Sequence, residues 1–174
     1  MRGSGRAPLE RAARDLRAAL RVAARGDRRA GDTADGAARD AHYWNFLFPR
    51  DEHDEHEGHD EGDAGGALII DWQLWRVGRG AFDLAYMIAL HGEADHRAEV
   101  EGEALMFYAA ELAKHGVHYR WPDLRRDYAL GAALDLLYPV RLCALGVPEA
   151  VWAPHLRRGF AAFDDLGCAS VLGI

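Results

Sequence analysis

Three short stretches decide how this sequence is interpreted: Asp40-Ala-His42-Tyr-Trp-Asn45, Leu68-Ile-Ile-Asp71-Trp-Gln73 and Gly78-Arg-Gly80-Ala-Phe-Asp83-Leu-Ala-Tyr86. In the first, an aspartate stands five positions before an asparagine. The second ends an apolar run on an aspartate, a charge that is costly to bury without a partner cation. The first two stretches supply one carboxylate that could accept a proton and two oxygen ligands of the kind that magnesium prefers.

Phosphoryl transfer to a hydroxyl group needs this combination of side chains. Asp40 would accept or orient the hydroxyl proton, while the Asn45 amide oxygen and the Asp71 carboxylate would hold the metal. Each residue also has a simpler interpretation, because Asp40 alone would be a turn or helix-capping residue and Asn45 alone a turn residue. The charge at the end of an apolar run favours a functional role for Asp71.

The three stretches resemble the aminoglycoside phosphotransferase and choline kinase-like group of small-molecule kinases. That group carries His-Gly-Asp, four residues, Asn, an apolar run into Asp-Trp or Asp-Phe, then Gly and Asp-Leu-Ala, and this chain follows the order from Asp40 onward. Trp72-Gln73 and the segment from Tyr108 to Tyr128 are most similar to the ecdysteroid kinase-like branch. The resemblance implies the C-terminal lobe of the protein-kinase-like fold, which is mainly α (α+β) with a short β-hairpin.

The resemblance also implies an activity and a set of roles. It implies an ATP-dependent transferase that phosphorylates a hydroxyl of a small molecule, with Mg²⁺ and ATP as cofactors. Asp40 would be catalytic, and Asn45 and Asp71 would bind the metal. The carboxylate of Asp83 would anchor backbone N–H groups of the catalytic loop and so support that loop. A role as a helix N-cap is the simpler interpretation of Asp83. Gly78, with Gly80, would permit a tight turn, and His42 would pack within the loop.

Hydrophobic patterning predicts the elements around these residues. Two apolar runs, Phe46-Leu-Phe48 and Ala67-Leu-Ile-Ile70, predict a hairpin that would hold Asn45 near Asp71. Beyond Asp83 the spacing predicts only helices, the last two opened by prolines near the first helical position. In the last helix an aromatic and leucine face at steps of four, four and three predicts core packing. The predicted helices are 83–91, 96–114, 122–145 and 149–165; the prolines are Pro122 and Pro148, and the face is Trp152, Leu156, Phe160 and Phe163.

An acidic insert, 51–66, separates the two predicted strands. Residues 51–63 hold eight acids and three histidines, His53, His56 and His59, which could together collect zinc or nickel. Mutual repulsion of the acids and the flexibility of Gly58 and Gly62 favour a solvated loop instead. A metal-buffering protein built on this insert remains a third function to test.

The part of the chain before Asp40 does not continue the family pattern. Residues 1–39 are rich in Arg and Ala and predict a basic amphipathic helix over 8–25, then loop or disorder over 26–39. Ala38-Arg39 stands where the family has His-Gly, and the single lysine, Lys114, follows the catalytic stretch, so no nucleotide-binding lysine is assigned. We therefore expect that the N-terminal nucleotide lobe is missing and that the chain is a truncated or frame-disrupted member. A catalytically inactive lobe, residues 40–174, that binds a small molecule or a partner is the alternative function.

Composition limits the remaining possibilities. The 174 residues are 49% hydrophobic with five Trp, which excludes disorder throughout, and no apolar run approaches the length of a membrane span. We expect a cytoplasmic protein with reduced, half-buried Cys143 and Cys168. The net charge of −7 argues against nucleic acid as a partner.

The hydroxyl acceptor and the oligomeric state stay open. A cationic acceptor could be attracted by three acids, Glu93, Asp95 and Glu101. Without a nucleotide lobe to cover it, the neighbouring surface of the chain would expose apolar side chains and favour self-association. The residues expected on that surface are Tyr43, Trp44 and Phe46.

Overall fold

A computed structural model of the chain describes residues 36–37, 45–47, 68–70 and 76–174. Four two-residue strands precede a group of helices, so the described part is mainly α, as predicted. The strands are β1 (Gly36–Ala37), β2 (Phe46–Leu47), β3 (Leu68–Ile69) and β4 (Arg76–Val77). The helices are α2 (Gly80–Ala85), the π-helix η4 (Tyr86–Leu90), α3 (Ala94–Ala113), α4 (Trp121–Asp135), α5 (Leu137–Ala144), α6 (Glu149–Asp165) and α7 (Cys168–Leu172).

The strands form two separate antiparallel pairs. β2 pairs with β3, matching Phe46 to Ile69 and Leu47 to Leu68, which is the pairing predicted from the two apolar runs. β1 pairs with β4, matching Gly36 to Val77. This second pair was not predicted, because residues 26–39 were expected to be loop or disorder. Glycine and alanine carry no hydrophobic period, so only the partner strand far along the chain reveals the extended conformation.

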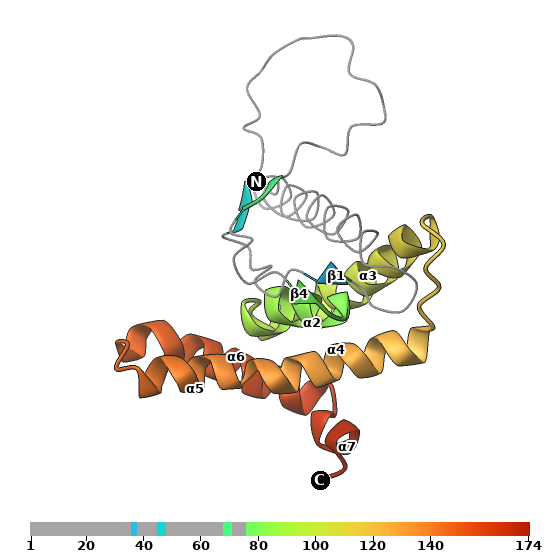
Figure 1. The fold of residues 1–174 in the computed structure, drawn as a ribbon. Coiled ribbons are helices and arrows are strands. Elements are labelled where there is room, and N and C mark those ends of the chain that lie inside the picture. Colours follow the sequence, from blue (N-terminus) through green and yellow to red (C-terminus); the bar gives the residue numbers. More distant parts are fainter. Residues whose placement is uncertain (1–35, 38–44, 48–67, 71–75) are drawn as a thin grey trace, which may run out of the picture.

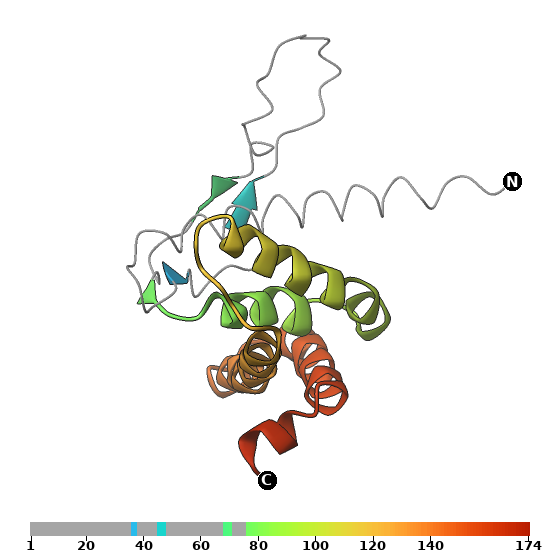
Figure 2. The ribbon, with the colours of Figure 1, turned by 90° about the vertical axis from the view of Figure 1, so that its right-hand side faces the viewer.

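The helices form layers around α2 and η4. Figures 1 and 2 show α3 on one side of α2 and η4, and α4 with α6 on the other. α2 packs along α4, and Gly131 of α4 makes this close approach possible: a Cβ atom there would lie 2.9 Å from the Ala85 Cβ and 3.0 Å from the Phe82 Cα. The core is therefore centred on the helix that directly follows β4. Its largest fully buried side chains include Leu84, Leu90, Tyr108, Leu112, Leu124 and Tyr128.

The start of α2 differs from the prediction. The helix begins at Gly80 with Arg79 as its N-cap residue, and Asp83 lies within the first turn instead of capping the helix. Arg79 makes no side-chain capping hydrogen bond, so packing fixes this helix end. Ala81 and Ala85 are both 0% exposed, which shows how completely the neighbouring helices cover α2. A carboxylate in the first turn still interacts favourably with the helix dipole.

The single helix predicted over 122–145 is two helices. α4 ends at Asp135, and α5 starts at Leu137 with Pro139 in its first turn. Proline has no N–H group and cannot donate to the carbonyl of Asp135, as a continuous helix would require. A new helix start accommodates the proline, because the first N–H groups of a helix need no intrahelical partner.

The predicted apolar face of α6 is only partly correct. Phe163 packs against the core, but Phe160 is 54% exposed. The residues of α6 that are buried are Gly159 and Ala162. A Cβ atom on Gly159 would lie 2.7 Å from the Leu136 side chain, so α6 meets its neighbours through small residues. The aromatic rings therefore lie toward the edge of the contact instead of at its centre.

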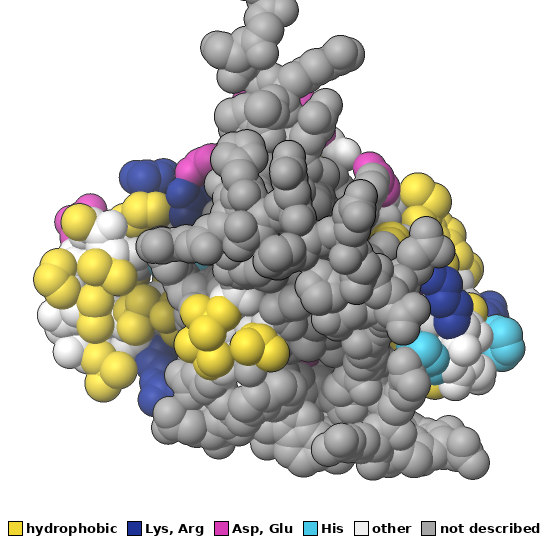
Figure 3. All heavy atoms as spheres, turned by 90° about the horizontal axis from the view of Figure 1, so that it is seen from above, with side chains coloured by type: hydrophobic (Ala, Val, Ile, Leu, Met, Phe, Trp, Pro, Cys, Tyr) yellow, Lys and Arg dark blue, Asp and Glu magenta, His cyan; other side chains and the backbone are white. Residues whose placement is uncertain are grey.

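The described surface carries apolar side chains at the end formed by α5 and α6, on the left in Figure 3. Exposed apolar residues of α5 and its C-cap include Leu137, Val140 and Leu145. Tyr43 and Trp44 of the predicted self-association surface lie outside the described residues, as does the side chain of Phe46. Self-association through that surface stays a prediction.

The two thiols differ from the expected half-buried state. Cys168 is fully buried and its Sγ donates to the Ala129 carbonyl at 3.1 Å, whereas Cys143 is exposed; both are free. Burial raises the pKa of the Cys168 thiol. Within residues 76–174 and the short strands before them, no helix has the length and hydrophobicity that crossing a membrane requires.

Candidate functional site

The six predicted site residues divide into two groups. Asp40, His42 and Asp71 lie outside the described residues, so their predicted roles stay predictions. Asn45, Gly78 and Asp83 are described. The backbone around these three residues shows how the sequence stretches that carry the other three are anchored.

Asn45 lies at the end of the β2–β3 pair. Its carbonyl accepts the backbone N–H of Ile70 at 2.8 Å, and the residue is 6% exposed. Ile70 is the residue directly before Asp71 in the chain. The strand pairing therefore joins Asn45 to the residue next to Asp71, across the acidic insert that separates them in sequence.

The two strand pairs also bound the segments that contain Asp40 and Asp71. Segment 38–44 runs from β1 to β2, and segment 71–75 runs from the end of β3 to β4. Since β1 pairs with β4 and β2 with β3, the residues flanking these segments are paired at both ends: Ala37 with Arg76, and Asn45 with Ile70. The residue before segment 38–44 is thus paired with the residue after segment 71–75, and the residue after 38–44 with the residue before 71–75.

The turn after β4 leads directly into the buried part of α2. Gly78 is half-buried, Gly80 is buried, and the Arg79 carbonyl accepts the N–H of Phe82 at 3.0 Å. Both glycines were predicted to allow a tight turn; Gly78 lies between β4 and α2, and Gly80 is the first residue of α2, so that role stays a prediction. Asp83, at 6% exposure, is buried within the helix layer, and its supporting role stays a prediction.

Sequence reasoning missed a cluster of polar side chains that holds this turn. Arg79 donates to the Oδ1 atom of Asp127 at 2.5 Å, and the Tyr119 hydroxyl donates to Oδ2 at 2.6 Å. Asp127 is a buried residue of α4, 3% exposed, so its charge is matched by a guanidinium and a hydroxyl donor. The cluster ties the residue after Gly78 to α4. Tyr119 stands in the segment that was noted for its family similarity, but no spacing relates it to Arg79.

A second buried network joins α3, α4 and α6. The Arg97 guanidinium, in a residue 2% exposed, donates to Glu101 at 2.8 Å and pairs with Asp165. The Tyr128 hydroxyl donates to the same Glu101 oxygen at 3.2 Å. Burial opposes the charge on Arg97, but the hydrogen bond and charge of Glu101 outweigh it and the pKa of Arg97 is raised. Burial, followed by the Glu101 charge, raises the pKa of Tyr128 well above its ordinary value of 10.0.

The three acids that were expected to attract a cationic acceptor have different surroundings. Arg158 donates to Glu93 at 2.9 Å, and this hydrogen bond lowers the pKa of Glu93. Glu101 is engaged by Arg97. Asp95 is exposed in the first turn of α3. Two of the three carboxylates are therefore matched by arginines, which leaves less negative charge for a cation than their sequence positions indicate.

Lys114, the single lysine, lies at the C-cap of α3. Its ammonium group donates to Glu111 one turn earlier at 2.6 Å, and its side chain is 63% exposed. The pair thus joins an exposed ammonium group to a buried carboxylate residue within one turn of α3. No group of three or more His, Cys, Asp or Glu in the described part of the chain could hold a metal ion. The acidic insert 51–63 lies outside that part, so its metal binding stays a prediction.

Comparison with protein families supports the resemblance. Residues 40–120 match the model of the ecdysteroid kinase-like family, and the predicted resemblance to this branch is confirmed over that part of the chain. The matched range includes Asn45, Asp71 and Asp83, together with Arg79 and Tyr119 from the missed cluster. Comparison with curated proteins and with solved structures gave no match. The family points to a small-molecule kinase-like protein, represented by part of its domain.

Proposed function

We propose that the segment from Asp40 to Asp83 is the metal-binding half of a phosphotransferase site, and that the protein acts in ATP-dependent phosphorylation of a hydroxyl group on a small molecule. The observation that carries the proposal is the hydrogen bond between the Asn45 carbonyl and the Ile70 N–H, at 2.8 Å. It links the two sequence stretches in which the metal ligands were predicted. The match to the ecdysteroid kinase-like family over residues 40–120 supports this class of reaction.

The residues present fit a magnesium ion in their chemistry. Asn45 is buried beside the residue preceding Asp71, and an amide oxygen with a carboxylate forms a donor set of the hard kind that Mg²⁺ takes alongside phosphate oxygens and water. Asn45 and Asp71 would hold the ion. When bound, it would offset the negative charge of the transferring phosphoryl group.

The remaining residues would prepare the site for this chemistry. Asp40 would accept the proton of the acceptor hydroxyl or orient that hydroxyl toward the phosphoryl group. The β1–β4 pair would limit how far the Asp40 and Asp71 segments can separate, since it joins Ala37 to Arg76. Arg79, through its ion pair with Asp127, would fix the chain a few residues after Asp71 to the helical core.

A lobe that binds without transferring phosphate is the second candidate. The surroundings of Lys114 favour this second candidate. Lys114 is the single lysine of the chain, and it is paired with Glu111 at the end of α3. A kinase of this general class uses a lysine on the nucleotide phosphates. The absence of a saturable response to ATP would therefore be the outcome expected from this alternative.

Magnesium-dependent nucleotide binding by the full chain tests the proposal. Replacing Trp121 and Trp152 by Phe leaves Trp44, Trp72 and Trp75, which lie beside the predicted ligands in sequence, as the fluorophores. We expect a saturable response to ATP that requires Mg²⁺ and weakens at least about tenfold in Asp71→Asn, which removes a ligand charge. Asp95→Asn is the matched control, because it removes an exposed aspartate outside the site.

Two results decide between the candidates. A response that does not depend on Mg²⁺, or that falls equally in the Asp71 and Asp95 variants, would contradict a metal site at Asn45 and Asp71. Phosphorus NMR of ATP with a panel of hydroxyl acceptors then separates the functions. Formation of ADP and a phosphate ester supports the transferase, whereas the absence of both an ATP response and turnover leaves only the non-catalytic lobe.

A further inference from the structure

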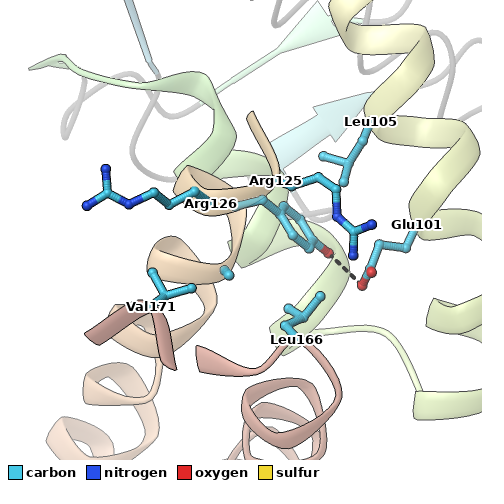
Figure 4. Close-up of a pocket in the computed structure, with 8 residues that line it drawn as sticks. Glu101, Leu105, Arg125, Arg126, Leu166 and Val171 are labelled. Carbon is cyan, nitrogen blue, oxygen red and sulfur yellow. Dashed lines mark hydrogen bonds between the residues drawn. The ribbon is translucent and has the colours of Figure 1, made fainter. Parts of the chain in front are cut away.

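A small pocket of about 150 Å³ lies between α3, α4 and the corner where α6 leads into α7. Its lining comes from helices that carry none of the six predicted site residues. Figure 4 shows Leu105 and Glu101 on one side, Leu166 and Val171 at the bottom, and the two arginines Arg125 and Arg126 on α4. The pocket is thus separate from the metal-binding half of the site in both its elements and its side chains.

One wall of the pocket is apolar. Leu105 is 3% exposed, and the half-buried Leu166 and Val171 face it from the α6–α7 corner. Leucine and valine side chains offer no hydrogen bonds, so this wall favours the hydrocarbon part of a ligand over water or a second polar group. The volume sets the size of that part, because a cavity of about 150 Å³ is large enough for benzene.

The polar side of the pocket has an excess of positive charge. Glu101 already accepts hydrogen bonds from the Arg97 guanidinium and the Tyr128 hydroxyl, so its negative charge is matched from within the protein. Arg125 and Arg126 add two guanidinium groups to the lining, both on exposed residues. In Figure 4 the Arg125 guanidinium points to the side of the pocket where Glu101 lies, and Arg126 extends away from it. A guanidinium suits a carboxylate because it can donate two parallel hydrogen bonds.

We propose that this pocket binds a small organic monoanion, with an apolar body of about six carbon atoms between Leu105, Leu166 and Val171 and a carboxylate at Arg125. A cation would meet the Arg125 guanidinium and a carboxylate that is already paired with Arg97. Inorganic phosphate would leave the apolar wall without a partner. The inference is independent of the proposed metal-binding half of the site, since none of the six predicted site residues lines the pocket.

Methyl NMR of the full chain with benzoate as the probe tests the pocket. We expect the methyl signals of Leu105, Leu166 and Val171 to shift together and to saturate with a dissociation constant on the order of 1 mM, as befits a ligand of this size. Benzamide, which has the same shape without the charge, and acetate, which lacks the apolar body, should each bind at least about tenfold more weakly. Sodium chloride at equal concentration controls for ionic strength.

Three variants assign the contacts. Arg125→Gln should weaken benzoate binding about tenfold and leave benzamide unchanged, because only the carboxylate contact is lost. Arg141→Gln, at an exposed arginine of α5 outside the pocket, is the matched control and should bind benzoate as the parent protein does. Val171→Phe should fill the pocket and abolish binding of both aromatic probes. The methyl spectrum of each variant also reports whether it is folded.

The proposal is overturned by any of three results. Benzoate shifts that do not saturate, or that spread over leucines of unrelated helices, would indicate non-specific association. Equal affinity in Arg125→Gln and Arg141→Gln would remove the carboxylate contact. Unchanged binding in Val171→Phe would place the ligand outside the pocket.

Discussion

Replacing Gly131 by Ala tests the central packing contact, that of α2 on α4. A Cβ atom at this position would lie 2.9 Å from the Ala85 Cβ, 3.0 Å from the Phe82 Cα and 3.1 Å from the Phe82 Cδ1. Two of these atoms are held by the α2 backbone, so the clash cannot be relieved by rotating a side chain. α2 would have to move away from α4, which would also move Asp83 and the turn after β4.

The magnitude follows from a matched pair of glycines. Gly102, in the middle of α3, has open space around it, because a Cβ atom added there would have no atom within 4 Å beyond its chain neighbours and the nearby backbone of its own helix. Alanine is favoured over glycine inside a helix by about 1 kcal/mol, and this gain applies to both positions. Gly102→Ala should therefore raise the free energy of unfolding by that amount. Gly131→Ala should fall about 1–3 kcal/mol below Gly102→Ala, since overpacking a close contact costs this much.

Urea unfolding followed by circular dichroism at the helix band measures both variants. Subtracting one variant from the other removes the helix-propensity term and leaves the cost of the clash. Equal stabilisation by the two alanines would refute the reasoning, because it would mean that α2 can move off α4 without loss. A large loss in Gly102→Ala would contradict the description of that glycine as facing open space.

Three further predictions concern the buried network and the thiols. Arg97→Met should lower the free energy of unfolding by about 3–5 kcal/mol, because it leaves the Glu101 carboxylate without its cation. Urea unfolding should show partial recovery of this free energy when Glu101→Gln is added. A loss as small as that of a surface ion pair would argue against burial of the network. Folding raises the pKa of Tyr128 above 10.0, so the stabilisation from its neutral form is complete below about pH 10 and should be lost as the pH rises through the folded-state pKa. Above about pH 10, the melting temperature of Tyr128→Phe should therefore fall less steeply with pH than that of the parent protein. Parallel plots of melting temperature against pH for the two proteins would refute this. A thiol reagent should modify the exposed Cys143 in the native protein and reach the buried Cys168 only in urea. Equal rates of modification of the two thiols in the native protein would mean that α7 opens readily.

Local signals predicted several elements because they depend on a few neighbouring residues. The prolines near the starts of the last two long helices are an example: α4 begins at Trp121 with Pro122 in its first turn, and α6 begins at Glu149 directly after Pro148. The apolar runs around the acidic insert predicted the β2–β3 pair in the same way. The division between α4 and α5 could also have been predicted, since Pro139 lies in the first turn of α5, where proline is tolerated. The long apolar pattern over residues 122–145 instead led to the prediction of one continuous helix.

Non-local contacts explain the elements that were missed or misplaced. β1 exists through its partner β4, and α2 begins three residues early because α4 and its Gly131 cover it. On α6 the period placed Phe160 in the core, yet the close approach of Gly159 to its neighbours turned that ring outward. In each case a distant surface, which no window of sequence contains, decided the outcome.

The sequence by itself determined the family to which residues 40–120 are similar, the order of the helices and the identity of the candidate metal ligands. Those features reside in fixed spacings, such as that between Asp40 and Asn45. The tertiary structure decided how the site is supported: it joined Asn45 to Ile70 and fastened Arg79 to Asp127, a residue 48 positions later. It also assembled the pocket at Arg125. The sequence determines which chemical groups the chain carries and how far apart they lie along it. The packing of distant helices determines which of those groups meet, because burial and ion pairing depend on surfaces that exist only after folding.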